Sequence, residues 1–229
     1  MIRTAIAVAL AAAAFSAHAS QVEIGAGQAQ YQTLGNGIWY QEGFQHTLNL
    51  KAPAFMVGLT GDLTPSVAWH VDYVYLGQAS VDSWDTPNDA NYSGHGYSGT
   101  PLPLAHYIGS GSVYGFAATL EAHTNGRLRF GVEGGPFLYH ASWSLSVPNW
   151  YPSVQTQPRI FEQSGPMQPV SFSQSHWALG YVVGISARYH AWGFSLRRYF
   201  DNAGFSGHGA DPWPPLWRAQ TVAAVTYTF

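Results

Sequence analysis

The chain has 229 residues and a formal net charge of −3, and only 9% of its residues are charged, against about 25% in soluble domains. Aromatic residues reach 15% and cysteine is absent, so no disulfide holds the fold. No basic stripe is available to neutralise phosphates, which excludes a nucleic-acid partner. No stretch offers the ~20 apolar residues of a membrane-spanning helix. Few charges and many aromatics therefore favour a membrane β-barrel, which needs only alternating apolar residues and aromatic girdles.

The first residues have the features of a secretory signal. Arg3 precedes an apolar run over 5–15, and Ala17-His18-Ala19 is the small-x-small pattern that signal peptidase cleaves. The run is too short to cross a bilayer as a helix. We expect residues 1–19 to be a signal peptide and residues 20–229 to be the mature barrel; the alternative, a retained membrane anchor, does not explain the cleavage pattern.

Eight segments with a period of two residues follow along the chain, as expected for strands with one apolar face. We expect them over 22–32, 46–60, 67–76, 113–122, 127–143, 176–189, 194–200 and 217–229. The third is the clearest, because Tyr73 and Tyr75 share one face and His70 and Asp72 the other. Tight turns are predicted at 61–65, 123–126 and 190–193, the second carrying Asn125-Gly126, a strong hairpin signal.

The connections alternate in length. Long loops follow the first, third, fifth and seventh strands, the longest over about 77–112 and 147–175. Short periplasmic turns and long extracellular loops are typical of bacterial barrels with both termini in the periplasm. A soluble barrel would also alternate, but its outer face would be polar, whereas here one face carries Trp, Tyr, Phe, Val and Leu. The sequence predicts an all-β fold: an eight-stranded antiparallel transmembrane β-barrel of the Gram-negative outer membrane.

The last strand carries apolar residues at alternate positions and ends on an aromatic one: Val225, Tyr227 and Phe229. This ending resembles the C-terminal signature of outer-membrane barrels, and the whole mature chain resembles the small eight-stranded class of OmpX and the OmpA barrel. The resemblance implies that the barrel-assembly machinery recognises the C-terminal strand. It also implies outer-membrane lipid and lipopolysaccharide as the surroundings of the barrel.

An eight-stranded barrel is just wide enough for side chains to fill, so a general pore is disfavoured. Inward-facing positions carry acidic and basic residues in similar numbers: Glu23, His70, Asp72, Glu121, Arg129, Glu133, Arg188 and Arg197. We expect these groups to pair in the lumen, because buried charges are tolerated only with partners; the alternative is a proton or ion path. His70 and Asp72 share a face but lack a third ligand, so neither a metal nor another cofactor is expected.

One segment at the end of the seventh strand, 199–204, resembles the active-site segment of the lipid A deacylases (the PagL family). Asn202, Ala203 and Gly204 match the family's His-x-Ser-Asn-Ala-Gly motif. Tyr199 stands where the family has its base and Asp201 where it has its nucleophile, and no Glu follows Asp201. Ester hydrolysis needs an activated hydroxyl beside a general base, so no catalytic residue is assigned and a deacylase-like hydrolase is kept as the alternative function.

The predicted loops carry many aromatic residues amid Ser, Gly and Asn: Trp84, Tyr92, Tyr97, Trp150, Tyr151, Trp213 and Trp217. Such residues contact proteins or sugars well, although girdles and loop packing use them too. Loops of this length are more often functional than incidental. The sequence therefore favours a non-enzymatic barrel whose loops contact an extracellular protein or glycan, or that has a structural role in the envelope.

Overall fold

The computed structural model describes residues 20–32, 45–85, 105–150, 153–157, 160–163, 165–201 and 219–229. Its strands are β1 (Gln21–Gln32), β2 (Gln45–Asn49), β3 (Lys51–Thr64), β4 (Val67–Asp85), β5 (Ala105–His123), β6 (Leu128–Trp150), β7 (Ser153–Gln157), β8 (Ile160–Gln163), β9 (Gln168–Tyr189), β10 (Trp192–Phe200) and β11 (Ala219–Thr228). Within these ranges no helix is long and apolar enough to cross a membrane.

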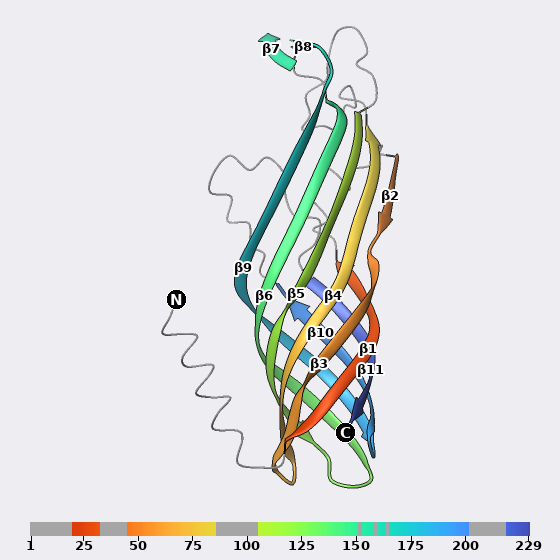
Figure 1. Ribbon diagram of the computed structural model, residues 1–229, viewed down its shortest axis with the longest axis vertical. Coiled ribbons are helices and arrows are strands. Elements are labelled where there is room, and N and C mark those ends of the chain that lie inside the picture. The colour runs from red at the N-terminus through yellow and green to blue at the C-terminus, as the bar shows by residue number, and fades with distance from the viewer. Residues whose placement is uncertain are drawn as a thin grey trace.

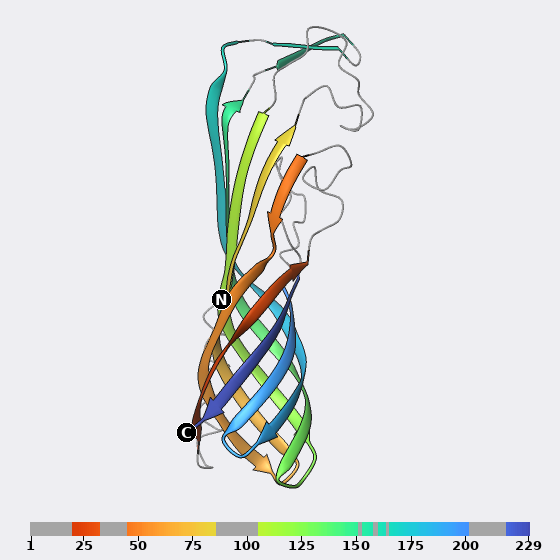
Figure 2. The same cartoon turned by 90° about the vertical axis from the view of Figure 1, so that its right-hand side faces the viewer.

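The strands close into a barrel (Figures 1 and 2). β2 and β3 are successive pieces of one wall strand, because both pair with β4. Every other wall strand is antiparallel to its neighbours, and the wall closes where β4 pairs with β5 and β1 pairs with β11. β7 and β8 pair only with each other. Counting β2 and β3 as one, the wall has eight strands, so the predicted fold class is confirmed.

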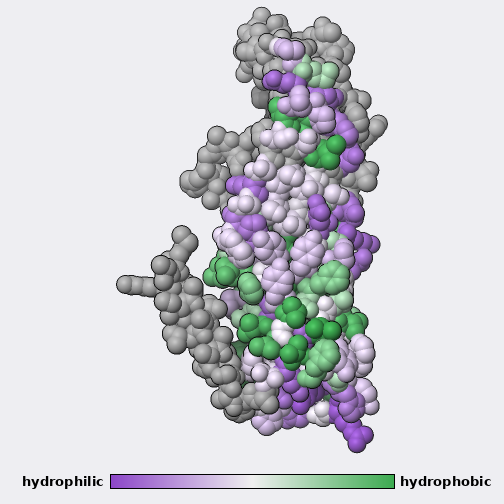
Figure 3. Space-filling view, in the orientation of Figure 1, coloured by the Kyte–Doolittle hydropathy of each residue, from purple (hydrophilic) through white to green (hydrophobic). Residues whose placement is uncertain are grey.

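Along most of each strand, side chains alternate between the interior and the outside of the wall. Phe116, Leu138 and Leu179 lie in register on adjacent strands and are 50%, 44% and 63% exposed, whereas Ala117 and Phe137 between them are buried. Figure 3 shows the apolar side chains gathered in a band over the lower half of the molecule. In water a contiguous apolar band of this kind would be a liability, and in a bilayer it faces the hydrocarbon. The chain is thus a transmembrane barrel.

A β-bulge at Gly77 keeps this alternation intact where β4 leaves the barrel. The β4–β5 register shifts between Tyr75 and Gln78, so Leu76 and Gly77 together face Val113. Gly77 has φ of 76°, a left-handed conformation in which glycine is favoured. The extra residue restores the alternation of inward and outward side chains, so Leu76 and Ala79 are both buried while Gln78 is exposed.

The strands are longer than the sequence predicts. β4 continues to Asp85 and β5 begins at Ala105, so the loop expected over 77–112 is strand at both ends. The loop expected over 147–175 is likewise shortened by β6 and β9 and contains the β7–β8 hairpin. The β5 extension alternates serine with glycine, so it lacks the apolar contrast by which strands are recognised. On β6 serine alternates with apolar residues such as Trp143 and Val147, so a strand pattern is present there.

Candidate functional site

The lumen holds a buried ion-pair cluster centred on Arg197 of β10. Its Nε and Nη2 donate to Glu133 Oε1 and Oε2 at 2.7 and 2.9 Å, and its Nη1 donates to Asp72 Oδ2 at 2.7 Å. The three side chains come from β10, β6 and β4, so the cluster ties together non-adjacent parts of the wall. Thr119 also donates to Glu133 Oε2, at 3.1 Å. A two-pronged guanidinium–carboxylate contact is the strongest form of such a pair.

Two further pairs lie beside this cluster. His70 Nε2 is 2.9 Å from Glu121 Oε2, and Ser186 Oγ donates to Glu121 Oε1 at 2.9 Å. Arg188 pairs with Glu23, which also accepts from Thr228 Oγ1 at 3.2 Å. Glu23, His70 and Glu121 are buried. Each of these carboxylates is thus held by a cation or imidazole together with a hydroxyl.

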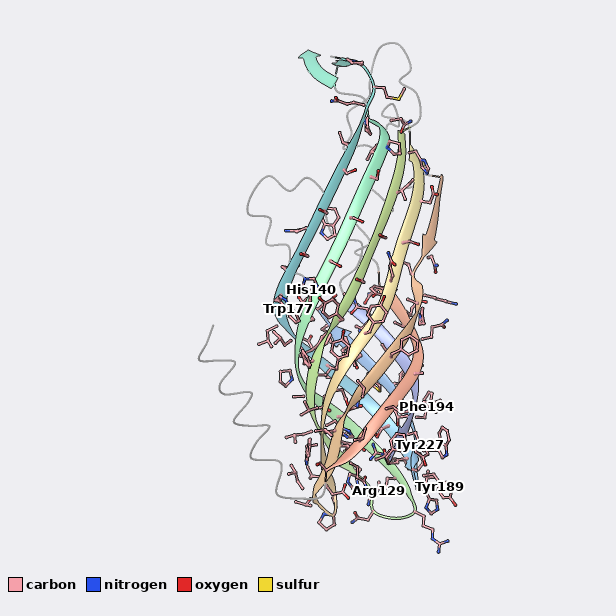
Figure 4. All side chains as sticks on the ribbon, in the orientation of Figure 1. Arg129, His140, Trp177, Tyr189, Phe194 and Tyr227 are labelled. Carbon is pink, nitrogen blue, oxygen red and sulfur yellow. The ribbon has the colours of Figure 1, made fainter. Side chains whose placement is uncertain are left out.

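Arg129 is placed differently from the other lumen candidates. It pairs with Asp62 at 3.2 Å, and the two side chains are 36% and 51% exposed. Both line an open polar recess of about 700 Å³ together with Arg127 and Arg188. Figure 4 shows Arg129 at the end of the barrel where the short turns lie. Arg129 therefore belongs to the periplasmic mouth, outside the buried clusters.

The buried clusters leave almost no free space. The remaining cavity among Glu23, His70, Glu133 and Arg197 measures about 10 Å³, about one water molecule at most. Of the residues that the structure describes, no three His, Asp or Glu side chains come close enough to hold a metal ion. In the part of the chain that the structure describes, the lower lumen is a packed polar plug.

Above this plug the lumen is filled by aromatic rings, of which the sequence singled out only Tyr199, and for its place in the deacylase-like segment. Phe137 and Tyr139 stack with centroids 5.5 Å apart, and Tyr199 meets Phe137 edge-on at 4.9 Å. Tyr31 is also buried, and its hydroxyl donates to the carbonyl oxygen of Gly77 at 2.8 Å. The alternation of residues along β6 indicates that Phe137 and Tyr139 point inward. Which rings they contact depends on how the whole wall closes.

The segment that resembles the lipid A deacylases lies partly in this interior. Tyr199 and Asp201 are 0% and 1% exposed, and Gln220 Nε2 donates to Asp201 Oδ2 at 2.8 Å. Residues 202–204, which carry the matching part of the motif, lie outside the described residues. The acyl chains of a membrane lipid run along the outer face of the wall, so Tyr199 and Asp201 do not face such a substrate.

On the extracellular side, β4, β5, β6 and β9, with β2 paired to the outer part of β4, rise beyond the rest of the described wall (Figures 1 and 2). Among the described residues, the β1–β11 ladder can be followed to Gln32 and Ala219 and the β9–β10 ladder to Phe200. The β6–β9 ladder continues to Trp150 and Gln168. We call the part of β4, β5, β6 and β9 beyond the β4 bulge, together with β2 at its β4 edge, the raised sheet. Of the loop aromatics named from the sequence, Trp84 and Trp150 have backbones in its strands, and the other five lie outside the described residues.

The outer face of the raised sheet is built of serine. An aromatic row comes first, in which Tyr114 stacks on His140 at 4.9 Å and Trp177 meets both rings edge-on; Figure 4 labels His140 and Trp177 side by side. Three rows follow beyond it, and nine of their twelve positions are serine. These rows are Gln78–Ser112–Ser142–Ser175, Ser80–Ser110–Ser144–Ser173 and Asp82–Ile108–Ser146–Ser171. We call these three rows the serine face.

No protein-family model and no curated protein matches the chain. Among solved structures it is similar to Ail, the attachment invasion locus protein of Yersinia pestis, with 14% identity, a TM-score of 0.45 and coverage of 92% of this chain and 97% of Ail. It is also similar to the outer membrane protein OprG from Pseudomonas aeruginosa, with 12% identity, a TM-score of 0.38 and coverage of 93% and 97%.

Proposed function

We propose that this protein is a surface-interaction component of the Gram-negative outer membrane, in which a filled barrel holds the raised sheet and the extracellular loops outside the cell. One observation carries the proposal: within the described residues, β4, β5, β6 and β9 stay paired far beyond the last residue pairs of β1, β10 and β11. Ordering so many residues outside the membrane has a conformational cost. A binding role that requires a rigid extracellular platform accounts for this conformational cost.

The filled lumen supports binding over transport. The Arg197 cluster and the rings of Phe137, Tyr139 and Tyr199 pack one above the other inside the wall. A solute would have to displace buried ion pairs, and breaking such pairs is strongly unfavourable. The polar network accordingly has a structural role in this proposal. The partners are the surrounding lipopolysaccharide and an extracellular protein or glycan bound by the loops.

Export by residues 1–19 and insertion by the barrel-assembly machinery belong to the same proposal. The C-terminal strand supports the second step, because Val225 and Phe229 are 51% and 65% exposed on the outer face. Tyr227 lies between Trp192 and Phe229, with ring centroids 5.0 and 4.9 Å away. An outward aromatic cluster at the end of the chain is accessible to an assembly factor before it meets lipid.

The test uses the purified protein reconstituted in nanodiscs and arrayed against extracellular-matrix proteins and glycans. We expect binding that is lost when external protease removes the extracellular loops while the barrel remains protected. Planar-bilayer recordings made in parallel should give no steady current, and lipid A from cells with and without the protein should have the same mass. A steady current would overturn the binding role in favour of a pore, and a lost acyl chain would overturn it in favour of the deacylase-like hydrolase.

A further inference from the structure

The serine face directly continues the lipid-facing surface. Its first row follows the aromatic row of Tyr114, His140 and Trp177 on the same side of the same strands. Aromatic girdles mark the edges of the hydrocarbon in membrane barrels. Whatever surrounds the barrel just outside the hydrocarbon therefore meets the serine face first.

The height of the serine face above the aromatic row determines whether phospholipid headgroups or the sugars of a glycolipid can cover it. Rows two residues apart are about 6.6–6.8 Å apart along a strand, so the third row lies about 14 Å above the aromatic row even at a strand tilt of about 45°. An ordinary headgroup layer is only about 5–7 Å deep on each side of the hydrocarbon. Phospholipid headgroups would thus reach the first row only, whereas a glycolipid that carries several sugars would cover all three.

The chemistry of the serine face matches sugars better than other partners. Its one charged residue, Asp82, lies 2.7 Å from His106. None of its twelve positions carries the lysine or arginine that binds phosphate through charge-assisted contacts. Serine is depleted in protein–protein interfaces, where aromatic residues and arginine are enriched. Hydroxyl groups both donate and accept hydrogen bonds, as sugar hydroxyls do.

The hydroxyls are also partly oriented in advance. Ser112 Oγ and Ser142 Oγ are 3.2 Å apart, and Ser110 Oγ and Ser144 Oγ are 3.4 Å apart. Each hydroxyl has one donor and two acceptor positions, so a hydroxyl paired within the sheet keeps capacity for a ligand. On β9, Ser171, Ser173 and Ser175 are exposed. Small side chains on neighbouring strands about 4.7–4.9 Å apart give a flat surface on which sugar rings can lie.

We infer that the serine face is a docking surface for the saccharide portion of the lipopolysaccharide that surrounds the barrel. The inference rests on the proposed outer-membrane location and deepens it, because it makes the outer wall of the raised sheet the contact with the glycolipid. The loops then remain free for an extracellular ligand.

The absence of cysteine from the chain allows a direct test with single-cysteine variants. Full-length protein carrying Ser144→Cys or Ser173→Cys is reconstituted in nanodiscs of phospholipid, of lipid A without further sugars, or of lipopolysaccharide with its core saccharide. The rate of reaction with a water-soluble maleimide is measured in each. We expect the rate at both positions to fall about tenfold only in the core-saccharide discs, a ratio that corresponds to about 1.4 kcal/mol.

Two control variants separate this inference from the proposed membrane location. Val183→Cys, at a position that is 46% exposed on the outer wall, should be protected in all three discs. Ser66→Cys, in the exposed turn between β3 and β4, should react equally in all three. Reaction at Val183→Cys as fast as at Ser66→Cys would overturn the membrane placement itself. Protection at Val183→Cys with equal rates at Ser144→Cys in all three discs would overturn the saccharide inference alone.

Discussion

Arg197 and Glu133 form a two-pronged ion pair in the barrel interior, 64 residues apart in sequence. The remaining nitrogen of the same guanidinium, Nη1, donates a hydrogen bond to Asp72 Oδ2. One cation therefore serves two buried carboxylates, and its removal would leave both without a counter-charge. The stability of the wall consequently depends on this single side chain.

We expect Arg197→Leu to destabilise the folded barrel by about 3–5 kcal/mol, because an unpartnered buried charge is strongly unfavourable. Urea unfolding in lipid vesicles, followed by heat-modified gel mobility, measures the loss. The triple variant Arg197→Leu, Asp72→Asn, Glu133→Gln should regain part of it. A single variant as stable as the native protein would show that the pair contributes nothing.

Substitutions on the lipid-facing wall should depend on depth. Val183→Arg and Val71→Arg should impair folding into vesicles by about 2–4 kcal/mol where these positions lie near the bilayer centre. Gln78→Arg, on the exposed serine face just beyond the aromatic row, is the matched control and should fold normally. Equal folding yields for all three variants would show that the apolar band has been placed wrongly.

The bulge on β4 should tolerate no side chain. A Cβ at Gly77 would lie 2.4 Å from the carbonyl oxygen of Pro53, and the residue has a positive φ. The left-handed conformation alone costs about 1–2 kcal/mol for a non-glycine residue, so Gly77→Ala should lower the free energy of unfolding by at least that amount. Gly134→Ala is the control, because its nearest neighbour would be 3.5 Å away. The same unfolding midpoint for both variants would contradict the bulge geometry.

The C-terminal residue should matter for assembly more than for stability. Phe229 is 65% exposed, so Phe229→Ser removes little packing, and spontaneous folding of the purified variant into vesicles should be nearly unchanged. Assembly in cells should be reduced, since the recognition signature is broken. Pulse-chase measurement of heat-modifiable protein in the outer membrane checks this. Native assembly rates in cells would remove the proposed role of Val225, Tyr227 and Phe229.

The lipid-facing part of the barrel could be predicted from the sequence. Its strands alternate between large apolar residues and small or polar ones, as in Leu128, Phe130 and Val132 against Arg129 and Glu133. In a bilayer every backbone group must be paired within the wall, so this alternation together with short turns is enough to predict eight closed strands. The same alternation predicts that the charged candidates lie on the inward face.

The raised sheet and the partners within the lumen could be found only from the tertiary structure. On β5, Ser110 and Ser112 alternate with glycine, so this stretch has no apolar contrast and resembles a loop until the neighbouring strands are in register. The pairing of Arg197 with Asp72, 125 residues away, depends on the stagger of strands that are not neighbours. A local pattern shows which face a side chain takes, whereas the closure of the whole wall decides which side chains meet.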